Sequence, residues 1–155
     1  MRELHLLVGC PGSGKSYFVN QQEGMKISRD QIRFAMLKPN DEYFAKEKQV
    51  VETFVWEVNE ALNSGENVVV WADATHANIK SRADFLNALN IPKNTKLVVE
   101  HFNTPLNTCL FRNGLREGRA KVPNGVVRRF FFQKQEPTIE EFEKFGFKEI
   151  EIKER

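Results

Sequence analysis

The sequence has few of the features that mark secreted, membrane-spanning or fibrous proteins. It contains only two cysteines among 155 residues, Cys10 and Cys109, which lie far apart in the chain. Extracellular domains that depend on disulfides carry more cysteines, so we expect both thiols to be reduced in a cytoplasmic protein. No apolar stretch approaches the roughly 20 residues of a membrane span, and we expect no membrane partner. The chain passes directly into a predicted strand, which indicates no signal peptide.

Charge of neither sign predominates, and no repeat, linker or low-complexity stretch divides the chain. The formal net charge is +2, with 41% hydrophobic and 28% charged residues, as in ordinary soluble globular proteins. A chain of 155 residues has the usual size of one domain and can bury a hydrophobic core. We therefore expect residues 1–155 to form a single domain.

One short segment near the N-terminus fits GxxxxGK(S/T), the phosphate-binding P-loop. Its glycines allow successive backbone N–H groups to face an anion, and Lys15 places an ammonium near the β- and γ-phosphates. The Ser16 hydroxyl can ligate Mg²⁺. An apolar stretch precedes the segment and a helix can follow it, as the motif requires. We expect the phosphates of a nucleoside triphosphate to bind Gly9, Cys10, Pro11, Gly12, Ser13, Gly14, Lys15 and Ser16.

Strand and helix patterns alternate along the rest of the chain. Such alternation favours right-handed parallel crossovers, so we expect a three-layer α/β/α P-loop NTPase of the kinase type with a mainly parallel five-stranded sheet. Clustered glycines and arginines predict an arginine-bearing lid over about residues 112–135. We expect strands at 4–8, 25–28, 67–73, 95–102 and 146–152, the last at a sheet edge. We expect a short helix at 29–37 and further helices at 42–62, 77–90 and 124–135.

Three local features are interpreted as structural. Thr104 is expected to cap a helix that begins at Pro105. Trp56 lies within the longest predicted helix, and burial habits favour core or edge packing over base stacking. The helical spacing of Phe130–Phe132 likewise favours the core.

Two aspartates follow predicted strands and should face the ligand, because ligands of such sheets lie over the carboxyl ends of the strands. Asp73 ends an apolar strand, as in the Walker B pattern, and with Ser16 suits the metal or its water shell. Asp30 suits the acceptor hydroxyl, since phosphoryl transfer needs mainly orientation and a late proton acceptor. A helix N-cap for Asp30 and a strand-end turn for Asp73 are the structural alternatives. Thr75 is assigned to the acceptor side with these aspartates.

Basic residues complete the predicted site. Arg33 lies one helical turn after Asp30 and can hold a phosphate of the acceptor. His76 is an alternative base because histidine titrates near neutral pH, although a loop histidine beside the site is the simpler interpretation. The arginines that can stabilise the transferring phosphoryl group are Arg112, Arg116 and Arg119.

These motifs resemble those of the bacteriophage polynucleotide 5′-hydroxyl kinase family over nearly the whole chain and in the same order. The DxxG and NKxD motifs of GTPases do not occur. The resemblance implies transfer of the γ-phosphate of ATP, or of another NTP, to a 5′-hydroxyl end of DNA or RNA in end repair, with Mg²⁺ as cofactor. It also implies the strand order 2-3-1-4-5 and frequent homo-oligomers, and a phage-encoded protein would act in the host cytoplasm. The matching segments are Gly9–Ser16, Ser28–Arg33, Asp73–Asn78, Arg112–Arg116 and Val122–Pro123.

The resemblance implies a role for each matching residue. Lys15 and Ser16 bind the NTP phosphates and the metal. Asp30 is the general base for the 5′-hydroxyl, and Arg33 contacts the 3′ phosphate of the acceptor's terminal nucleotide. Asp73 supports the site.

The lid arginine that clamps the β- and γ-phosphates in the family corresponds most closely to Arg116. The lid is about one residue longer here, so Arg119 is also a candidate. The family's D-x-N motif reads Asp73-Ala74-Thr75, which leaves the asparagine contact open. No DxDxT segment occurs, so we expect no 3′-phosphatase domain.

Two other functions stay open. The chain can be a P-loop kinase of a small-molecule hydroxyl, like zeta-toxin or metabolite kinases, or a non-catalytic nucleotide-binding module. Asp30 and Arg33 argue against the module, because a protein that only binds nucleotide needs no acceptor machinery.

Overall fold

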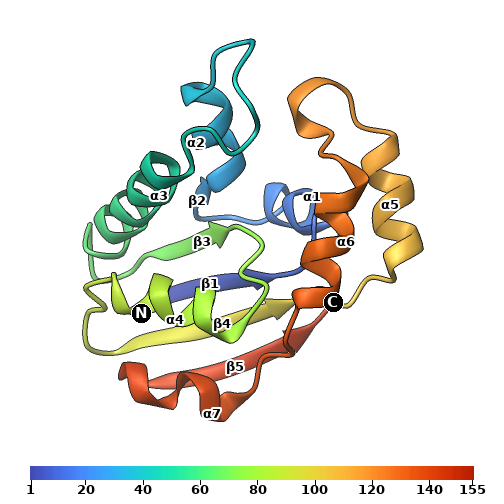
Figure 1. Cartoon of the computed structure of the whole chain (residues 1–155). Coiled ribbons are helices and arrows are strands. Elements are labelled where there is room, and N and C mark those ends of the chain that lie inside the picture. Colours follow the sequence, from blue (N-terminus) through green and yellow to red (C-terminus); the bar gives the residue numbers. More distant parts are fainter.

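A five-stranded parallel sheet forms the centre of the structure, a computed structural model that describes residues 1–155 (Figure 1). The strand order is β2-β3-β1-β4-β5, and every neighbouring pair is parallel. The predicted α/β fold and strand order are therefore confirmed, with the C-terminal strand at an edge. The strands are β1 (Arg2–Val8), β2 (Met25–Ser28), β3 (Val69–Asp73), β4 (Thr95–His101) and β5 (Glu149–Glu154).

Helices connect the strands, and side-chain caps begin several of them. The Ser28 hydroxyl accepts a hydrogen bond from the Gln31 N–H at 3.2 Å at the start of α2. Asn78 and Ser81 form a capping box at the start of α4. The helices are α1 (Lys15–Asn20), α2 (Arg29–Met36), α3 (Glu47–Leu62), α4 (Ile79–Asn87), α5 (Leu106–Gly114), α6 (Asn124–Gln133) and α7 (Ile139–Phe142), with 3₁₀ turns at Gly118–Ala120 and Glu143–Phe145.

Alternate residues of the central strands face opposite sides of the sheet, and different helices cover each side. The larger core lies on one side, where Leu4 and Leu6 of β1 share a cluster with Phe54 of α3 and Phe85 of α4. On the other side, Leu7 belongs to a smaller cluster with residues of α1, including Val19. The sheet therefore lies between two helical layers, and the carboxyl ends of its strands point toward the P-loop side (Figure 1).

A third apolar cluster lies beyond the sheet and joins the P-loop to the lid. Cys10 of the loop and Cys109 of α5 are buried in it together with Val122 and Val127. Phe130 is half-buried against the same cluster. This cluster holds α5 and α6 beside the phosphate-binding loop.

The longest helix begins later than its apolar spacing predicts. We expect a helix over 42–62, whereas α3 starts at Glu47. The preceding residues form turns that direct the Tyr43 hydroxyl and the Tyr43 and Phe44 rings toward Arg33. These tertiary contacts outweigh the local helical pattern.

Other local expectations need correction. Trp56 is not in the core, because the residue is 62% exposed; it lies at the edge of the fold, where it lines a surface pocket with Ile27 and Ile32. The core interpretation is also wrong for Phe132, which is 72% exposed, although Phe130 and Phe131 are half-buried. Thr104 does not cap α5: its hydroxyl donates to the Ser13 carbonyl at 2.8 Å, and Pro105 occupies the cap position.

None of the helices combines the length and the hydrophobicity needed to cross a bilayer.

Candidate functional site

The P-loop links the end of β1 to the start of α1 and is shaped by its glycines. Gly12 has φ 85°, and a Cβ atom added there would lie 2.4 Å from the Cys109 carbonyl oxygen, so only glycine allows α5 to approach the loop this closely. The Ser13 carbonyl accepts hydrogen bonds from Thr104 at 2.8 Å and Arg112 at 3.1 Å. The loop is therefore fixed before any ligand binds.

Lys15 lies in the loop as a buried cation. It is 8% exposed, and its Nζ donates to the Cys10 carbonyl at 3.2 Å. Burial lowers the pKa of Lys15, while the charges of Asp73 and Asp30 oppose this shift. No carboxylate lies within ion-pair distance of Nζ, so the ammonium is available to an anionic ligand.

Ser16 and Asp73 meet at the carboxyl end of β3, as the sequence predicts. The Ser16 hydroxyl donates to Asp73 Oδ2 at 2.8 Å. Asp73 is 7% exposed, and burial raises the pKa of its carboxyl group, although Lys15 and Ser16 act in the opposite direction. A carboxylate and a hydroxyl oxygen fit Mg²⁺, which takes few protein ligands and completes its shell with water and phosphate oxygens.

Asp30 lies across the cleft from the P-loop at the start of α2. Because Ser28 provides the helix N-cap, the carboxylate of Asp30 is free for other contacts. It accepts hydrogen bonds from Arg33 and, at 2.9 Å, from the Tyr43 hydroxyl, and its side chain stays 49% exposed. Burial and the Asp30 charge raise the pKa of Tyr43, so this phenol remains a donor. Asp30 is thus oriented and open to a ligand.

Arg33 is almost fully engaged with its neighbours. Its Nε and Nη2 donate to Glu47 at 2.8–3.0 Å, and its Nη1 donates to Asp30 and, at 3.0 Å, to Tyr43. These bonds engage all three guanidinium nitrogens. A contact between Arg33 and an acceptor phosphate would compete with them.

Arg29 is the cation of this region that the sequence reasoning missed. Its guanidinium lies 4.9 Å above the Phe54 ring, and its buried Nε has no hydrogen-bond partner. Burial lowers the pKa of Arg29, with Glu47 acting against this shift. Its place directly before Asp30 in a segment that follows a strand was the signal available in the sequence.

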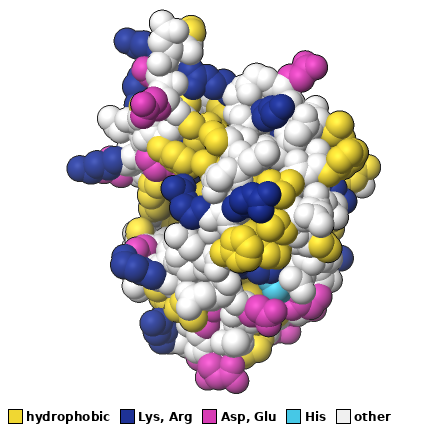
Figure 2. All heavy atoms as spheres, turned by 45° about the vertical axis from the view of Figure 1, so that its right-hand side comes forward, with side chains coloured by type: hydrophobic (Ala, Val, Ile, Leu, Met, Phe, Trp, Pro, Cys, Tyr) yellow, Lys and Arg dark blue, Asp and Glu magenta, His cyan; other side chains and the backbone are white.

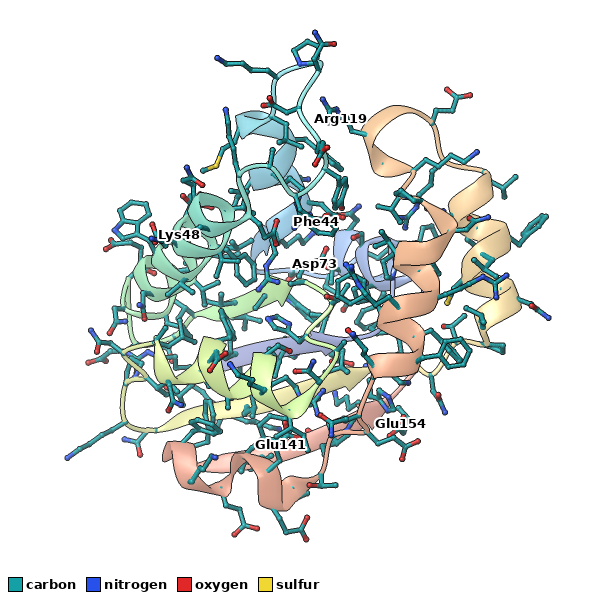
Figure 3. The ribbon with its side chains drawn as sticks, in the orientation of Figure 1. Phe44, Lys48, Asp73, Arg119, Glu141 and Glu154 are labelled. Carbon is teal, nitrogen blue, oxygen red and sulfur yellow. The ribbon has the colours of Figure 1, made fainter.

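One cleft brings the two halves of the site together. Donor-side, acceptor-side and lid residues all line it, and Thr75 lies beside Asp73 at its base. Figure 3 shows Asp73 near the centre of this region, with Phe44 beside it on the side of α2 and α3. The lining residues that concern the predicted chemistry are Gly12, Gly14, Lys15, Ser16, Arg29, Asp30, Arg33, Asp73, Thr75 and Arg116.

The three lid arginines have different surroundings. Arg112 reaches the P-loop through the Ser13 carbonyl. Arg116 lines the cleft, and its charge acts on the pKa of both Lys15 and Asp73. Arg119 instead donates to the carbonyls of Asp41 at 2.6 Å and Pro39 at 2.8 Å, in the loop after α2. Figure 3 shows Arg119 at the tip of the lid, directed toward that loop. The geometry therefore favours Arg116 over Arg119 as the residue that faces the phosphates.

His76 lies behind the site rather than in it. It is 2% exposed, and its Nδ1 lies 3.0 Å from the Leu7 carbonyl. Burial, followed by the charge of Arg29, lowers the pKa of His76 well below its usual value. A neutral, enclosed imidazole does not reach a ligand in the cleft, which favours the structural interpretation of this residue.

Solved structures with a similar fold include kinases of different substrates. Two structures of a Pnkp1/Rnl/Hen1 complex, one described as an RNA repair complex, are 24% and 19% identical to this chain, with TM-scores of 0.56 and 0.60. They cover 72% and 85% of this chain, which spans only 38% and 43% of the matched chains.

Two further structures match along almost the whole chain. A fungal RNA kinase is 14% identical with a TM-score of 0.58, covering 97% of this chain and 74% of its own. A gluconokinase from Sinorhizobium meliloti 1021 is 17% identical with a TM-score of 0.56, covering 99% of this chain and 82% of its own. At these identities the likeness establishes the P-loop kinase fold alone.

Comparison with curated proteins gave no match. Comparison with protein families matched residues 4–137 to the family AAA_33, described as an AAA domain. Because that match covers most of the chain and includes the P-loop, both aspartates and the lid, this protein belongs to the AAA_33 family of AAA domains.

Proposed function

We propose that this protein transfers the γ-phosphate of ATP to the 5′-hydroxyl end of DNA or RNA, as a step in end healing or repair. The observation that carries the proposal is the carboxylate of Asp30, which lies in the same cleft as the P-loop, half-exposed and oriented by two donors. A nucleotide-binding module would have no use for such a group. We expect the reaction to take place in the cytoplasm, and the resemblance to phage kinases predicts homo-oligomers.

The donor half of the reaction rests on the P-loop. The loop N–H groups and Lys15 bind the β- and γ-phosphates of ATP, and Ser16 with Asp73 would hold Mg²⁺. When bound, Mg²⁺ neutralises charge that develops on the phosphate oxygens. Arg116 reaches the transferring group from the lid, where an arginine can contribute on the order of 10³-fold or more to the rate.

The acceptor half rests on α2. Asp30 accepts a hydrogen bond from the 5′-hydroxyl, directs its oxygen toward the γ-phosphorus and takes up its proton late in the transfer. Arg33 and Tyr43 hold the carboxylate, and Glu47 holds Arg33. The cation left for an acceptor phosphate is Arg29, whose guanidinium makes no hydrogen bond within the protein.

Two features favour a polynucleotide over a neutral small molecule. A sugar hydroxyl offers no anion to Arg29, whereas a nucleotide chain carries a phosphate next to its 5′-terminal nucleoside. Figure 2 shows Lys and Arg side chains in the middle of one face, next to a hydrophobic patch, with Asp and Glu side chains both above and below them. Exposed arginines on this lid side include Arg112, Arg128 and Arg129. A kinase of a small-molecule hydroxyl is the second candidate, because the gluconokinase shares the fold.

The decisive assay incubates the protein with γ-labelled ATP, Mg²⁺ and a 5′-hydroxyl oligonucleotide of DNA or RNA. We expect label at the 5′ end, and we expect Asp30→Asn to lower kcat by about 10²–10⁴-fold while the KM for ATP changes little. Lys48→Ala, an exposed residue on α3 that points away from the cleft, is the matched control (Figure 3). Transfer only to gluconate or another metabolite would support the second candidate, and tight ATP binding without transfer to any acceptor would refute both.

A further inference from the structure

The two cysteines of the chain meet behind the P-loop. Cys10 is the second residue of the loop, Cys109 lies on α5, and their sulfur atoms are 3.0 Å apart. Both thiols are free and buried, with Cys10 4% and Cys109 0% exposed. A disulfide bond is about 2.05 Å long, so these sulfurs need to approach by only about 1 Å to become bonded.

The surroundings of Cys10 favour its reaction with an oxidant. The S–H···S hydrogen bond with Cys109 lowers the pKa of Cys10 to about 7, and the ammonium of Lys15 adds to this effect, whereas burial opposes it. The same hydrogen bond, together with burial, raises the pKa of Cys109. Cys10 therefore ionises more readily than Cys109 and supplies the thiolate, the form of cysteine that reacts with peroxides, while Cys109 lies in place to resolve the product.

A disulfide bond between Cys10 and Cys109 would alter the geometry of the phosphate-binding loop. The Cys10 carbonyl accepts hydrogen bonds from the Ser13 N–H at 3.1 Å and from Lys15 Nζ at 3.2 Å, so displacing Cys10 displaces both groups. Gly12 lies so close to the Cys109 backbone that a Cβ atom there would be 2.4 Å from the Cys109 carbonyl oxygen. The loop therefore has little room to move further toward α5. α5 leads directly into the lid that carries Arg116.

We propose that Cys10 and Cys109 form a reversible disulfide that ties the P-loop to α5 and weakens nucleotide binding. With hydrogen peroxide as the oxidant, the Cys10 thiolate attacks one peroxide oxygen, the O–O bond breaks, and Cys10 sulfenic acid and hydroxide form. The hydroxide takes up the proton that the Cys10 thiol released on ionising and becomes the first water. The Cys109 sulfur then attacks the Cys10 sulfur, the S–S bond forms, the S–O bond breaks, and the second oxygen leaves as water with the Cys109 proton. Two thiols lose two electrons, and one peroxide becomes two waters. The proposal does not depend on which acceptor the enzyme uses.

The test exposes the folded protein to hydrogen peroxide, removes the oxidant, denatures the protein and alkylates the remaining thiols before intact-mass measurement. We expect Cys10 and Cys109 to lose their reactivity together, with the loss of two hydrogens and a monomeric protein, and dithiothreitol to restore both thiols. Cys109→Ala should instead retain oxygen on Cys10 without forming an intramolecular disulfide. Cys109→Ser replaces it if the alanine variant unfolds. Two thiols that stay alkylatable, or disulfides only between molecules, would overturn the proposal.

The effect on the site is measured separately with a fluorescent ATP analogue. Loss of a charge-assisted contact to phosphate predicts that the oxidised wild type binds about tenfold more weakly, with recovery after dithiothreitol. Peroxide-treated Cys109→Ala should keep more of its affinity than the treated wild type. A disulfide that forms without changing nucleotide affinity would overturn the proposed effect on the loop.

Discussion

Two arginines four positions apart on α2 differ sharply in what surrounds them. The guanidinium of Arg33 donates hydrogen bonds to Glu47, Asp30 and Tyr43. The guanidinium of Arg29 instead lies over the Phe54 ring, and its buried Nε has no hydrogen-bond partner. A buried donor without a partner is costly, so such a group commonly serves a ligand. At the scale of single residues, Arg33 holds the Asp30 carboxylate, and Arg29 is the cation that we propose for an acceptor phosphate.

This difference predicts a selective defect in Arg29→Ala. Removing a charge-assisted contact should raise KM by about 10- to 100-fold for a nucleoside 3′-phosphate, and far less for the same nucleoside without phosphate. Steady-state kinetics on the two acceptors measure this, with Lys48→Ala as control. If the two acceptors lose efficiency equally, Arg29 does not bind the phosphate.

The buried carboxylate of Asp73 lowers the stability of the folded protein at neutral pH, and we propose that the same carboxylate binds the metal. Its pKa is raised by burial, so the folded protein holds this proton more tightly than the unfolded chain does. The associated stability is therefore present below about pH 4, the ordinary aspartate pKa, and is lost as pH rises through the raised pKa.

We therefore expect Asp73→Asn to raise Tm by a few degrees at neutral pH, with a difference that shrinks in acid, while Mg²⁺-dependent transfer is lost. The measurement is the Tm of the wild type and of Asp73→Asn between about pH 4 and neutral pH. A lower Tm for Asp73→Asn at neutral pH would show that the hydrogen bond from Ser16 and the nearby charge of Lys15 outweigh the cost of burying the carboxylate.

At the scale of elements, the lid and the loop after α2 close over the cleft from opposite sides. The 3₁₀ turn Gly118–Ala120 carries Arg119, whose guanidinium binds carbonyls between Lys38 and Asp41. Arg116, a few residues earlier, faces the cleft. One short segment thus carries both an arginine that binds the loop after α2 and an arginine that lines the cleft, for which we propose phosphate binding.

The contact between Arg119 and the loop after α2 should be separable from catalysis. Arg119→Ala should increase deuterium uptake in segments 38–41 and 114–123 and lower kcat only a few-fold, because Arg119 donates to carbonyls of the loop after α2 and does not line the cleft. Arg116→Ala should lower kcat on the order of 10³-fold without this change in exchange. Equal losses of kcat in the two variants would assign the clamp to both arginines.

At the scale of the whole molecule, one buried arginine ties the C-terminal segment to the rest of the fold. Arg82 on α4 is 0% exposed, pairs with Glu141 at 2.6 Å, and donates to the carbonyls of His76, Ala77 and Gln135. It therefore connects the loop after β3, the end of the lid segment and α7.

Removing this side chain leaves the Glu141 carboxylate and the carbonyls of His76 and Gln135 without the donor they have in the folded protein, whereas the Ala77 carbonyl keeps its bond from the Gln135 N–H at 2.9 Å. Arg82→Ala should lower the free energy of unfolding by about 3–5 kcal/mol. Lys80→Ala on the same helix breaks an ion pair with Asp84 in which the two side chains are 85% and 65% exposed. This variant should change the free energy of unfolding by less than about 1 kcal/mol. Urea unfolding of both variants tests the contrast, and similar losses would mean that the Arg82 network contributes little.

The sequence by itself determined the features that depend on neighbours along the chain. The spacing of glycines, Lys15 and Ser16 specified the P-loop, apolar periodicity indicated the strands, and their alternation with helices indicated parallel pairing, whereas the strand order was expected only from the family resemblance. Asp30 and Asp73 were expected to lie together because each follows a strand, and the carboxyl ends of parallel strands lie along the same edge of the sheet.

Only the tertiary structure decided which distant groups meet. It engaged Arg33 with Glu47, left Arg29 unpaired, directed Arg119 to the α2 loop and brought Cys10 against Cys109. Local periodicity carries no information on such pairs, since each depends on how whole helices pack on the sheet. The same packing left Trp56 on the solvent side of α3, although its residue type favours burial.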